Sequence, residues 1–304
     1  MNIMSITNEQ IKAHAKALGM DMCGVASIDR FANSPAGKHP RDVLPGCKSV
    51  IVVGARLLDG VVQANFRAFE DGRADLKGIY GTYGYTLIPN YELTYACYSI
   101  ARYIESNDDG IATPCSTGPM TNGWQISIRH AAVAAGLGQF GHMSIVLTPE
   151  YGPRNRFGVV LTTLDIEPDP MYEGPNLCSN CGICAKVCPT GALSAPGGEL
   201  AHVEIGGKSF DYSPPNVAKC LKALQAMTKE LGGRDDYLPE KDPTMADLAE
   251  AESRMPLSTL GLQHINSWNC GKCQTYCPAG NWSKRYKETG LSQGPSRAFV
   301  DEKM

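Results

Sequence analysis

The sequence predicts an α+β protein in which a domain of mixed helices and strands is followed by a ferredoxin-like domain. Helical and strand patterns are interspersed through the first 170 residues. Eight of the twelve cysteines then lie between Cys178 and Cys277, at the spacing found in ferredoxins. We therefore expect domains at 1–170 and 171–283, with an insertion at about 195–268 in the second and a polar tail at 284–304.

Hydrophobic periodicity places the elements of the first domain. Helical spacing after a cap at Thr7 or Asn8, with Gly19 at the end, predicts an opening helix. A short run of β-branched residues from Lys48 to Gly54 predicts a buried strand. In chain order, the expected elements are helix 6–18, strands 21–27 and 48–54, helices 90–105 and 126–135, and strands 144–148 and 157–163.

Tyrosines gather in the middle of this domain. On the helix at 90–105, Tyr91, Tyr95 and Tyr98 form one stripe, which we interpret as core packing with the hydroxyls reaching partners. The preceding stretch from Gly78 to Tyr85 alternates glycines and tyrosines, and we expect it to be a loop that lines a ligand pocket. The alternative for the stripe is that its phenols line a ligand pocket, and the alternative for the glycine–tyrosine segment is core packing.

The second domain carries two cysteine motifs. The first, with its proline, is C-x2-C-x2-C-x3-C-P, and the second repeats its last part as C-x2-C-x3-C-P. In two-cluster ferredoxins the last cysteine of each motif serves the other cluster. We expect one [4Fe–4S] cluster on Cys178, Cys181, Cys184 and Cys277, and another on Cys188, Cys270, Cys273 and a further ligand.

Cys220 is assigned as that further ligand by elimination, because it is the one cysteine between the motifs. It lies near the start of an expected helix at 217–231. The alternatives are a zinc site and a structural Cys220, but zinc does not call for four cysteines in eleven residues followed by proline. The four cysteines before residue 178 are interpreted as small buried apolar residues.

The insertion is expected to contain a β-hairpin at 199–212 around Gly206-Gly207, and then a long polar surface excursion at 232–256. The segment Gly136-Leu-Gly138-Gln-Phe-Gly141 is literally G-x-G-x-x-G. A dinucleotide site needs a strand before these glycines and a helix after them. Here the order is reversed, so the glycines are expected to form a tight helix-to-strand turn or to let backbone lie close to a flat cofactor.

Composition excludes several classes of function. With 43% hydrophobic and 19% charged residues the chain can form a sizeable core, and its net charge of −3 gives no positive field for a phosphate backbone. Nucleic acids and anionic membranes are therefore poor candidate partners. No apolar run approaches the ~20 residues of a spanning helix, and the first five residues show no export signal. We expect a cytoplasmic protein.

Taken together, these segments resemble the superfamily of epoxyqueuosine reductases and corrinoid-dependent reductive dehalogenases. The resemblance runs from about Lys38 to Pro278. It is carried by Lys38-His-Pro with Leu44-Pro-Gly-Cys-Lys-Ser-Val, by the tyrosine segment, by the two cysteine motifs, and above all by the stretch from Ile128 to Thr162. That stretch, with Thr148-Pro-Glu-Tyr-Gly-Pro-Arg154, is closest to the dehalogenase version.

The resemblance implies a nitroreductase-like domain holding a base-off corrinoid (cobalamin), supplied with electrons by the nearer cluster. Consistent with base-off binding, the chain has no D-x-H-x-x-G segment that could offer a lower histidine ligand. The residues expected to bind the corrinoid are Asn122, Arg129, Gly136, Gly138, Gly141, Met143, Ser144 and Tyr151.

In this superfamily a tyrosine or an aspartate supplies a proton to the substrate. Asn122 lies near the position of the aspartate, and an amide cannot donate an ionisable proton. Tyr83 or Tyr85 lies near the position of the tyrosine, and the basic position after Gly141 is His142. We therefore expect Tyr83 or Tyr85 to pair with His142 over the cobalt face. The alternative is that all three only pack.

Three functions are compatible with these observations. The first is a corrinoid-dependent reductase of a small organic molecule, by dehalogenation or by reduction of an epoxide or similar C–O bond, supplied by an external donor such as a ferredoxin or flavodoxin. The second is an electron-transfer or accessory protein that relays electrons without its own catalysis. The third is a flavin-dependent reductase, with flavin in place of the corrinoid.

Overall fold

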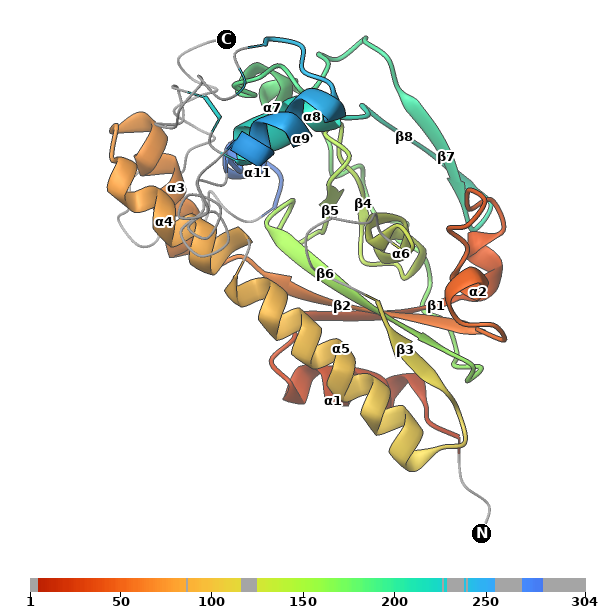
Figure 1. Cartoon of the computed structure of the whole chain (residues 1–304). Helices are drawn as coiled ribbons and strands as arrows, with labels where there is room; N and C mark the ends of the chain where they lie inside the picture. Colours follow the sequence, from red (N-terminus) through yellow and green to blue (C-terminus); the bar gives the residue numbers. More distant parts are fainter. Residues whose placement is uncertain are drawn as a thin grey trace.

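The structure is a computed structural model, and it describes residues 5–85, 87–115, 125–225, 227–228, 238, 240–254 and 270–280. Its centre is a four-stranded antiparallel sheet in the order β1-β2-β6-β3 (Figure 1). The strands are β1 (Met22–Ser27), β2 (Ser49–Arg56), β3 (Ala112–Pro114) and β6 (Asn155–Thr162). β2 is buried at all but its last position, which explains its unbroken β-branched run.

Helices cover both faces of this sheet. α1 (Asn8–Ala17) and α5 (Ile88–Asn107) pack on one face, and α6 (Ile128–Ala134) packs on the other (Figure 1). Thr7 caps α1 through a capping box with Gln10, as the sequence indicated. Each face therefore has its own hydrophobic core, with β2 contributing alternate residues to both.

Short elements connect these layers. They are η1 (Ile28–Phe31), α2 (Pro40–Val43), α3 (Asp59–Glu70), η2 (Ala74–Leu76), α4 (Lys77–Tyr80), the π-helix η3 (Gly81–Tyr85), β4 (Gln139–Phe140) and β5 (Val146–Leu147). β4 and β5 pair as a small hairpin after α6, so a helix precedes the glycine segment and a strand follows its first turn. The order excludes a Rossmann phosphate turn, as expected.

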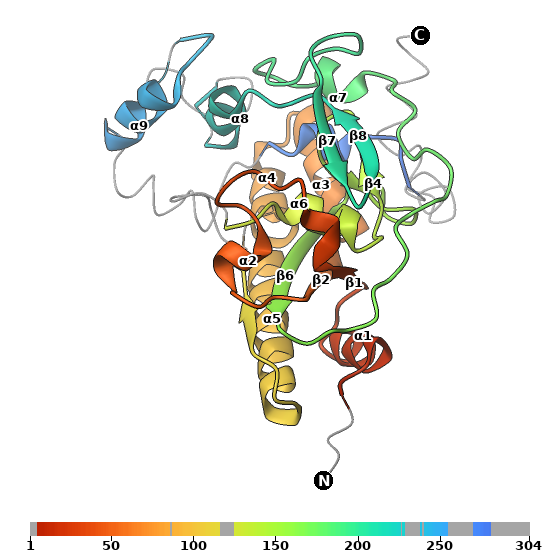
Figure 2. The same cartoon turned by 90° about the vertical axis from the view of Figure 1, so that its right-hand side faces the viewer.

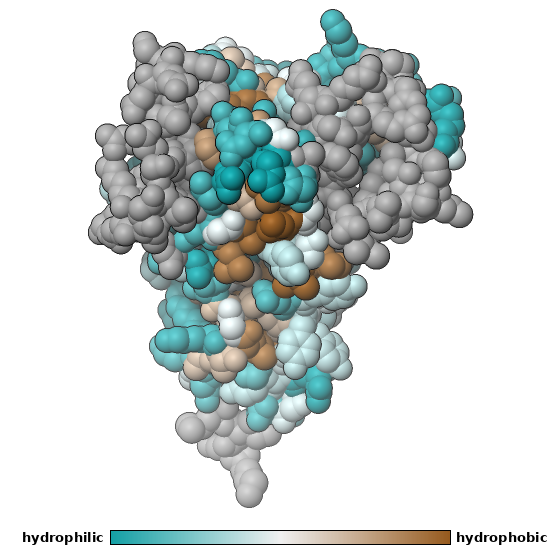
Figure 3. Space-filling view, turned by 90° about the vertical axis from the view of Figure 1, so that its left-hand side faces the viewer, coloured by the Kyte–Doolittle hydropathy of each residue, from teal (hydrophilic) through white to brown (hydrophobic). Residues whose placement is uncertain are grey.

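The tyrosine stripe of α5 is not core packing, and the glycine–tyrosine segment is not a loop, while its expected part in lining a ligand pocket stays a prediction. Tyr91, Tyr95 and Tyr98 are 67%, 65% and 52% exposed, because α5 turns its aliphatic stripe to the sheet and leaves the tyrosines on the surface. Figure 3 shows a face of the molecule on which brown hydrophobic residues lie among teal hydrophilic ones. The segment before α5 is helical instead of a loop, and Tyr80 within it is fully buried.

The cysteine-bearing part lies against one end of the sheet domain (Figure 1). It contains α7 (Ile183–Lys186), the hairpin β7 (Ala201–Ile205) and β8 (Lys208–Tyr212), α8 (Val217–Leu224), α9 (Met245–Arg254) and α11 (Lys272–Thr275). The hairpin turns at Gly206 and Gly207, both with positive φ, as expected. In Figure 2 the hairpin lies beside α6.

The expected excursion at 232–256 is in part a packed helix. Leu248 and Ala251 of α9 are buried with Met227 and Leu238 in a small separate core. The helix expected at 217–231 was too long, because α8 ends at Leu224 and residues 227–228 are not helical; residues 226 and 229–231 lie outside the described residues. Within the part of the chain that the structure describes, none of the helices has the length and apolar character needed to span a bilayer.

Candidate functional site

The two cysteine motifs form the same local structure. In each, a C-G-x-C turn places the glycine at positive φ, 73° for Gly182 and 58° for Gly271, directly before a one-turn helix. Glycine adopts this left-handed conformation without a Cβ penalty, so the chain can reverse between two cysteines. α7 and α11 lie against each other, which brings the two motifs together.

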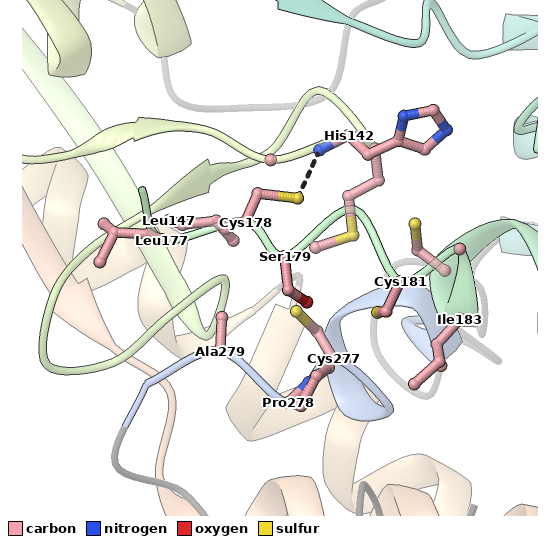
Figure 4. Close-up of a pocket in the computed structure, with 14 residues that line it drawn as sticks. His142, Leu147, Leu177, Cys178, Ser179, Cys181, Ile183, Cys277, Pro278 and Ala279 are labelled. Atoms are coloured by element: carbon pink, nitrogen blue, oxygen red, sulfur yellow. Dashed lines mark hydrogen bonds between the residues drawn. The ribbon is translucent and has the colours of Figure 1, made fainter. Parts of the chain in front are cut away.

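The first set of cysteines lines one cavity. Cys178, Cys181, Cys184 and Cys277 line a cavity of about 240 Å³ together with His142, Met143 and Leu147 (Figure 4). The backbone N–H of His142 donates to the Sγ atom of Cys178 at 3.4 Å. Cys277 comes from the second motif, so the structure brings the four cysteines expected to bind the first cluster to one cavity. Cys181 is the exposed member.

The second set is brought together by the loop after Cys188. Thr190 donates to the carbonyl of Lys219 at 2.9 Å, and the N–H of Asn216 donates to the carbonyl of Ala192 at 2.8 Å. These bonds fix the start of α8, and with it Cys220, beside Cys188. The thiols of Cys188, Cys220, Cys270 and Cys273 act on one another electrostatically.

Burial raises the pKa of these thiols. It is raised to about 12 in Cys184 and Cys270 and to about 11 in Cys220 and Cys277, and neighbouring thiols add to the effect. A cluster would therefore displace protons when it binds. Within the described residues, no three His, Cys, Asp or Glu side chains are spaced to hold a single metal ion.

Polar side chains of the sheet domain hold the second motif in place. Arg154, which is buried, donates to the carbonyl oxygens of Cys277 at 2.9 Å and of Ala279. Asn65 of α3 donates to the carbonyl of Cys270 at 3.2 Å and to Thr275 at 2.9 Å. These contacts couple the geometry of both cysteine sets to the sheet domain.

The structure does not bring the expected catalytic group together. The ring of His142 is buried, and its Nε2 atom lies 2.7 Å from the carbonyl oxygen of Ser194, beside the first cysteine set. Tyr83 is 51% exposed on η3. Tyr85 packs against Arg156, whose guanidinium lies 4.6 Å from the ring centroid. The predicted pairing with His142 is therefore not formed, because His142 and Tyr85 face different cysteine sets.

Tyr85 instead belongs to a polar group beside the second set. Cys220 acts electrostatically on both Tyr85 and Arg129, so these three side chains lie near one another. Burial raises the pKa of Tyr85, and Arg156 opposes this effect. The Arg129 side chain is exposed, but partial desolvation of its guanidinium by neighbouring atoms lowers its pKa. Arg156 also donates to Asn90 at 2.8 Å.

The glycines of the G-x-G-x-x-G segment are explained by the chain's own packing. A Cβ on Gly136 would lie 2.1 Å from the carbonyl oxygen of Pro170, and one on Gly138 would lie 2.0 Å from that of Leu147. A Cβ on Gly141 would lie 3.1 Å from the Leu147 side chain. The tight turn is therefore confirmed, and a larger side chain at Gly138 would disturb the β4–β5 hairpin whether or not a cofactor binds there.

The other expected cofactor residues are scattered around this region. Met143 is buried in the wall of the first cavity. Ser144 has a positive φ of 65° and accepts from Arg129 through its carbonyl at 2.9 Å. Tyr151 lies at the turn before β6, where Gly280 approaches its backbone. Asn122 lies outside the described residues.

The sequence interpretation missed three side chains of the site, namely Arg156, Asn65 and Lys77. Arg156 lies within the stretch from Ile128 to Thr162 that carries the family resemblance, so its place in the sequence offered a signal. Asn65 and Lys77 gave no signal, because both lie in segments whose contact with the second motif depends on tertiary structure alone.

Comparisons with known proteins agree with this geometry. Residues 172–194 match the 4Fe-4S binding domain family. The chain is similar to the epoxyqueuosine reductase of Gloeobacter violaceus, with 32% identity covering 94% of this chain and 81% of that protein. It is also similar to the tetrachloroethene reductive dehalogenase of Sulfurospirillum multivorans, with 40% identity over 78 residues, 25% of this chain and 15% of that protein.

A solved structure of an epoxyqueuosine reductase with an epoxyqueuosine-modified tRNA-Tyr stem loop has the same fold. The TM-score is 0.53 at 19% identity, covering 89% of this chain and 64% of that one. The chain also spans less than two thirds of the length of two Bacillus epoxyqueuosine reductases. The matched iron–sulfur domain and the curated relative together indicate an iron–sulfur oxidoreductase. At 32% identity over nearly its whole length, the chain belongs to the epoxyqueuosine reductase family.

Proposed function

We propose that the chain binds two [4Fe–4S] clusters and a base-off cobalamin, and that it reduces a carbon–oxygen or carbon–halogen bond of an organic substrate. The observation that carries this proposal is the sorting of eight cysteines into two sets of four, the second beside Tyr85 and Arg129. We infer the domain boundaries 1–170 and 171–283 from the same arrangement, with the first domain a nitroreductase-like support for the cofactor.

The two cysteine sets differ in their access to solvent. Cys181 of the first set is exposed, whereas no member of the second set is. Electron transfer favours a donor that can approach closely, so the first set is the side on which an external ferredoxin or flavodoxin would dock. The second set faces the polar group of Tyr85, Arg129 and Arg156, which is the side for the cobalamin and the substrate.

When bound, the clusters would supply single electrons and the cobalamin a low-valent cobalt able to reduce the substrate. The chain's own part is to hold a proton nearby. Tyr85 keeps its phenolic proton at neutral pH, because burial raises its pKa. Arg156, packed on the ring, would stabilise the phenolate left after the proton is transferred. Arg129 is an exposed donor beside this group.

Family membership favours an epoxide as the reducible group. A related epoxyqueuosine reductase has been solved with a modified tRNA stem loop, which weakens the argument from net charge against an RNA substrate. The proton-donating role of the family's aspartate cannot be transferred to this chain, because Asn122 lies at the position expected for that aspartate. We propose a C–O bond as the first substrate class to test, both in a free nucleoside and in an RNA stem loop, with small aryl halides as the second class.

The cofactor content can be tested by anaerobic reconstitution with iron and sulfide, with and without hydroxocobalamin. We expect about eight iron atoms per chain and absorption bands of a base-off corrinoid after gel filtration. Cys220→Ala should lose iron from the second set and retain the first, whereas Cys47→Ala, which removes a buried cysteine outside both sets, should keep full iron. Bound zinc without acid-labile sulfide would contradict the cluster assignment.

The same samples separate the competing functions. Two clusters without retained corrinoid or flavin would favour the electron-relay alternative. A bound flavin in the protein as purified would favour the flavin-dependent alternative. Corrinoid retained together with reduction of a supplied epoxide or aryl halide would support the proposal.

A further inference from the structure

Two lysines surround one aromatic ring next to the second cysteine set. The Nζ atom of Lys77 lies 5.1 Å from the ring centroid of Phe69, and that of Lys272 lies 4.7 Å from the same centroid. Lys272 also approaches the ring of Tyr276, at 5.8 Å. Lys77 is only 6% exposed, although a lysine at this depth is uncommon in proteins. Its burial calls for a physical reason.

Lys77 is placed there by the contact of α4 with the second motif. Tyr80, in the same helical turn, donates from its hydroxyl to Gln274 of α11 at 3.2 Å. A Cβ on Gly271 would lie 2.3 Å from that hydroxyl, so only glycine allows this approach. α3, which carries Phe69, is tied to the same motif by Asn65. The ammonium group is therefore held at the cysteine loop by a rigid, buried arrangement.

The ammonium group and the loop also interact electrostatically. Burial and Lys272 lower the pKa of Lys77, while Cys270 raises it. The nearby carboxylate of Glu70 accepts the hydroxyl hydrogen of Tyr276. The ammonium group of Lys77 thus lies on the side of Cys270, where its burial limits screening by water and salt.

We propose that Lys77 is a positioning residue that raises the reduction potential of the cluster bound by Cys188, Cys220, Cys270 and Cys273. An oxidised cubane with four thiolate ligands is an anion, and reduction adds one more negative charge. A fixed ammonium group therefore stabilises the reduced form more than the oxidised form. This inference rests on the proposed function, since it requires the second cluster to form.

The test is a redox titration of the reconstituted protein, with the reduced clusters followed by electron paramagnetic resonance. The variants are Lys77→Met, which keeps the aliphatic stem on Phe69, and Lys77→Arg, which keeps the charge. Lys208→Met is the matched control, because Lys208 lies on the β7–β8 hairpin and pairs with Glu173 at 2.9 Å. Cys220→Ala identifies the signal of the second cluster.

We expect Lys77→Met to shift the midpoint potential of the second cluster to a more negative value and to leave the first cluster unchanged. Lys77→Arg should restore the wild-type potential, and Lys208→Met should match the wild type. Unchanged potentials in Lys77→Met with both clusters present would overturn the inference and leave the proposed function standing. Loss of half the iron in Lys77→Met would overturn it too, because the role would then be structural. A wild type without the second cluster would remove the proposed function itself.

Discussion

Arg154 offers a direct test of how the sheet domain controls the first cysteine set. Its guanidinium donates to the carbonyl oxygens of Cys277 at 2.9 Å and of Ala279, and reaches that of Gln274 at 3.4 Å. The side chain is 3% exposed, so water cannot replace these bonds without opening the structure. Arg154→Met keeps much of the volume and removes every donor. The loop that carries Cys277 would then be held less firmly.

The magnitude follows from the two close bonds. A hydrogen bond from a charged donor contributes roughly 1.5–3 kcal/mol, so losing two costs about 3–6 kcal/mol. If the loop must open locally before the first cluster is lost, the lower figure raises the opening equilibrium by about two powers of ten, since each 1.4 kcal/mol is tenfold.

The assay is the rate of iron loss to a strong chelator under anaerobic conditions, measured on the reconstituted protein. Arg154→Met should release about half of its iron roughly a hundred times faster than the wild type, by the arithmetic of the opening equilibrium. Arg67→Met is the control, because Arg67 is half-exposed and pairs with Asp71 on the surface of α3, where such a pair contributes about 0.5 kcal/mol or less. Equal rates in Arg154→Met and the wild type would refute the reasoning.

Further predictions concern protons. Burial, and to a smaller extent Arg129, lower the pKa of His130 to about 4 in the folded protein. As pH falls below about 6.5, the unfolded chain therefore takes up this proton before the folded protein does. The free energy of unfolding should decline between about pH 6.5 and 4, by up to about 3 kcal/mol. His130→Gln should flatten that decline in thermal unfolding midpoints, and identical pH profiles would contradict it. Once a substrate is found, Tyr85→Phe should lower turnover at least tenfold while cobalt reduction stays intact. This loss is smaller than the roughly 100-fold or more that a positioned proton donor typically contributes to the rate. Tyr83→Phe should remain near wild type, because Tyr83 is exposed, and equal effects of the two substitutions would remove Tyr85 from the proposed role.

The parts of the fold that were predicted from sequence are those with local signals. The capping box at Thr7, the β-branched run of β2 and the Gly206-Gly207 turn each determine their own structure within a few residues. The grouping of Cys277 with Cys178, Cys181 and Cys184 was predictable for the same reason, because each motif forms one turn and one short helix, and the two must meet to complete a set of four.

The errors have a common physical cause. Whether the tyrosine stripe faces the core depends on which side of α5 packs against the sheet. In the structure the opposite, aliphatic side of α5 packs there. Tyr80 is fully buried because Gly271, almost two hundred residues later, leaves space for its ring. His142 bonds to the carbonyl of Ser194, which lies after the first cysteine motif, and the local sequence holds no signal for this contact. Each outcome was decided by a partner distant in sequence.

The start of β6 contributes to both cysteine sets. Arg154 directly precedes β6 and Arg156 is its second residue, and Asn155 between them donates to the carbonyl oxygens of Val146 and Gly152. Arg154 reaches the loop of Cys277, and Arg156 reaches Tyr85 beside the second set. A shift of β6 by one residue against β2 would turn Arg156 to the other face of the sheet and displace the adjoining Arg154. The register of the central sheet therefore fixes the positions of the first set's last ligand and of the proposed proton donor relative to each other, which ties the sheet domain's fold directly to the proposed chemistry.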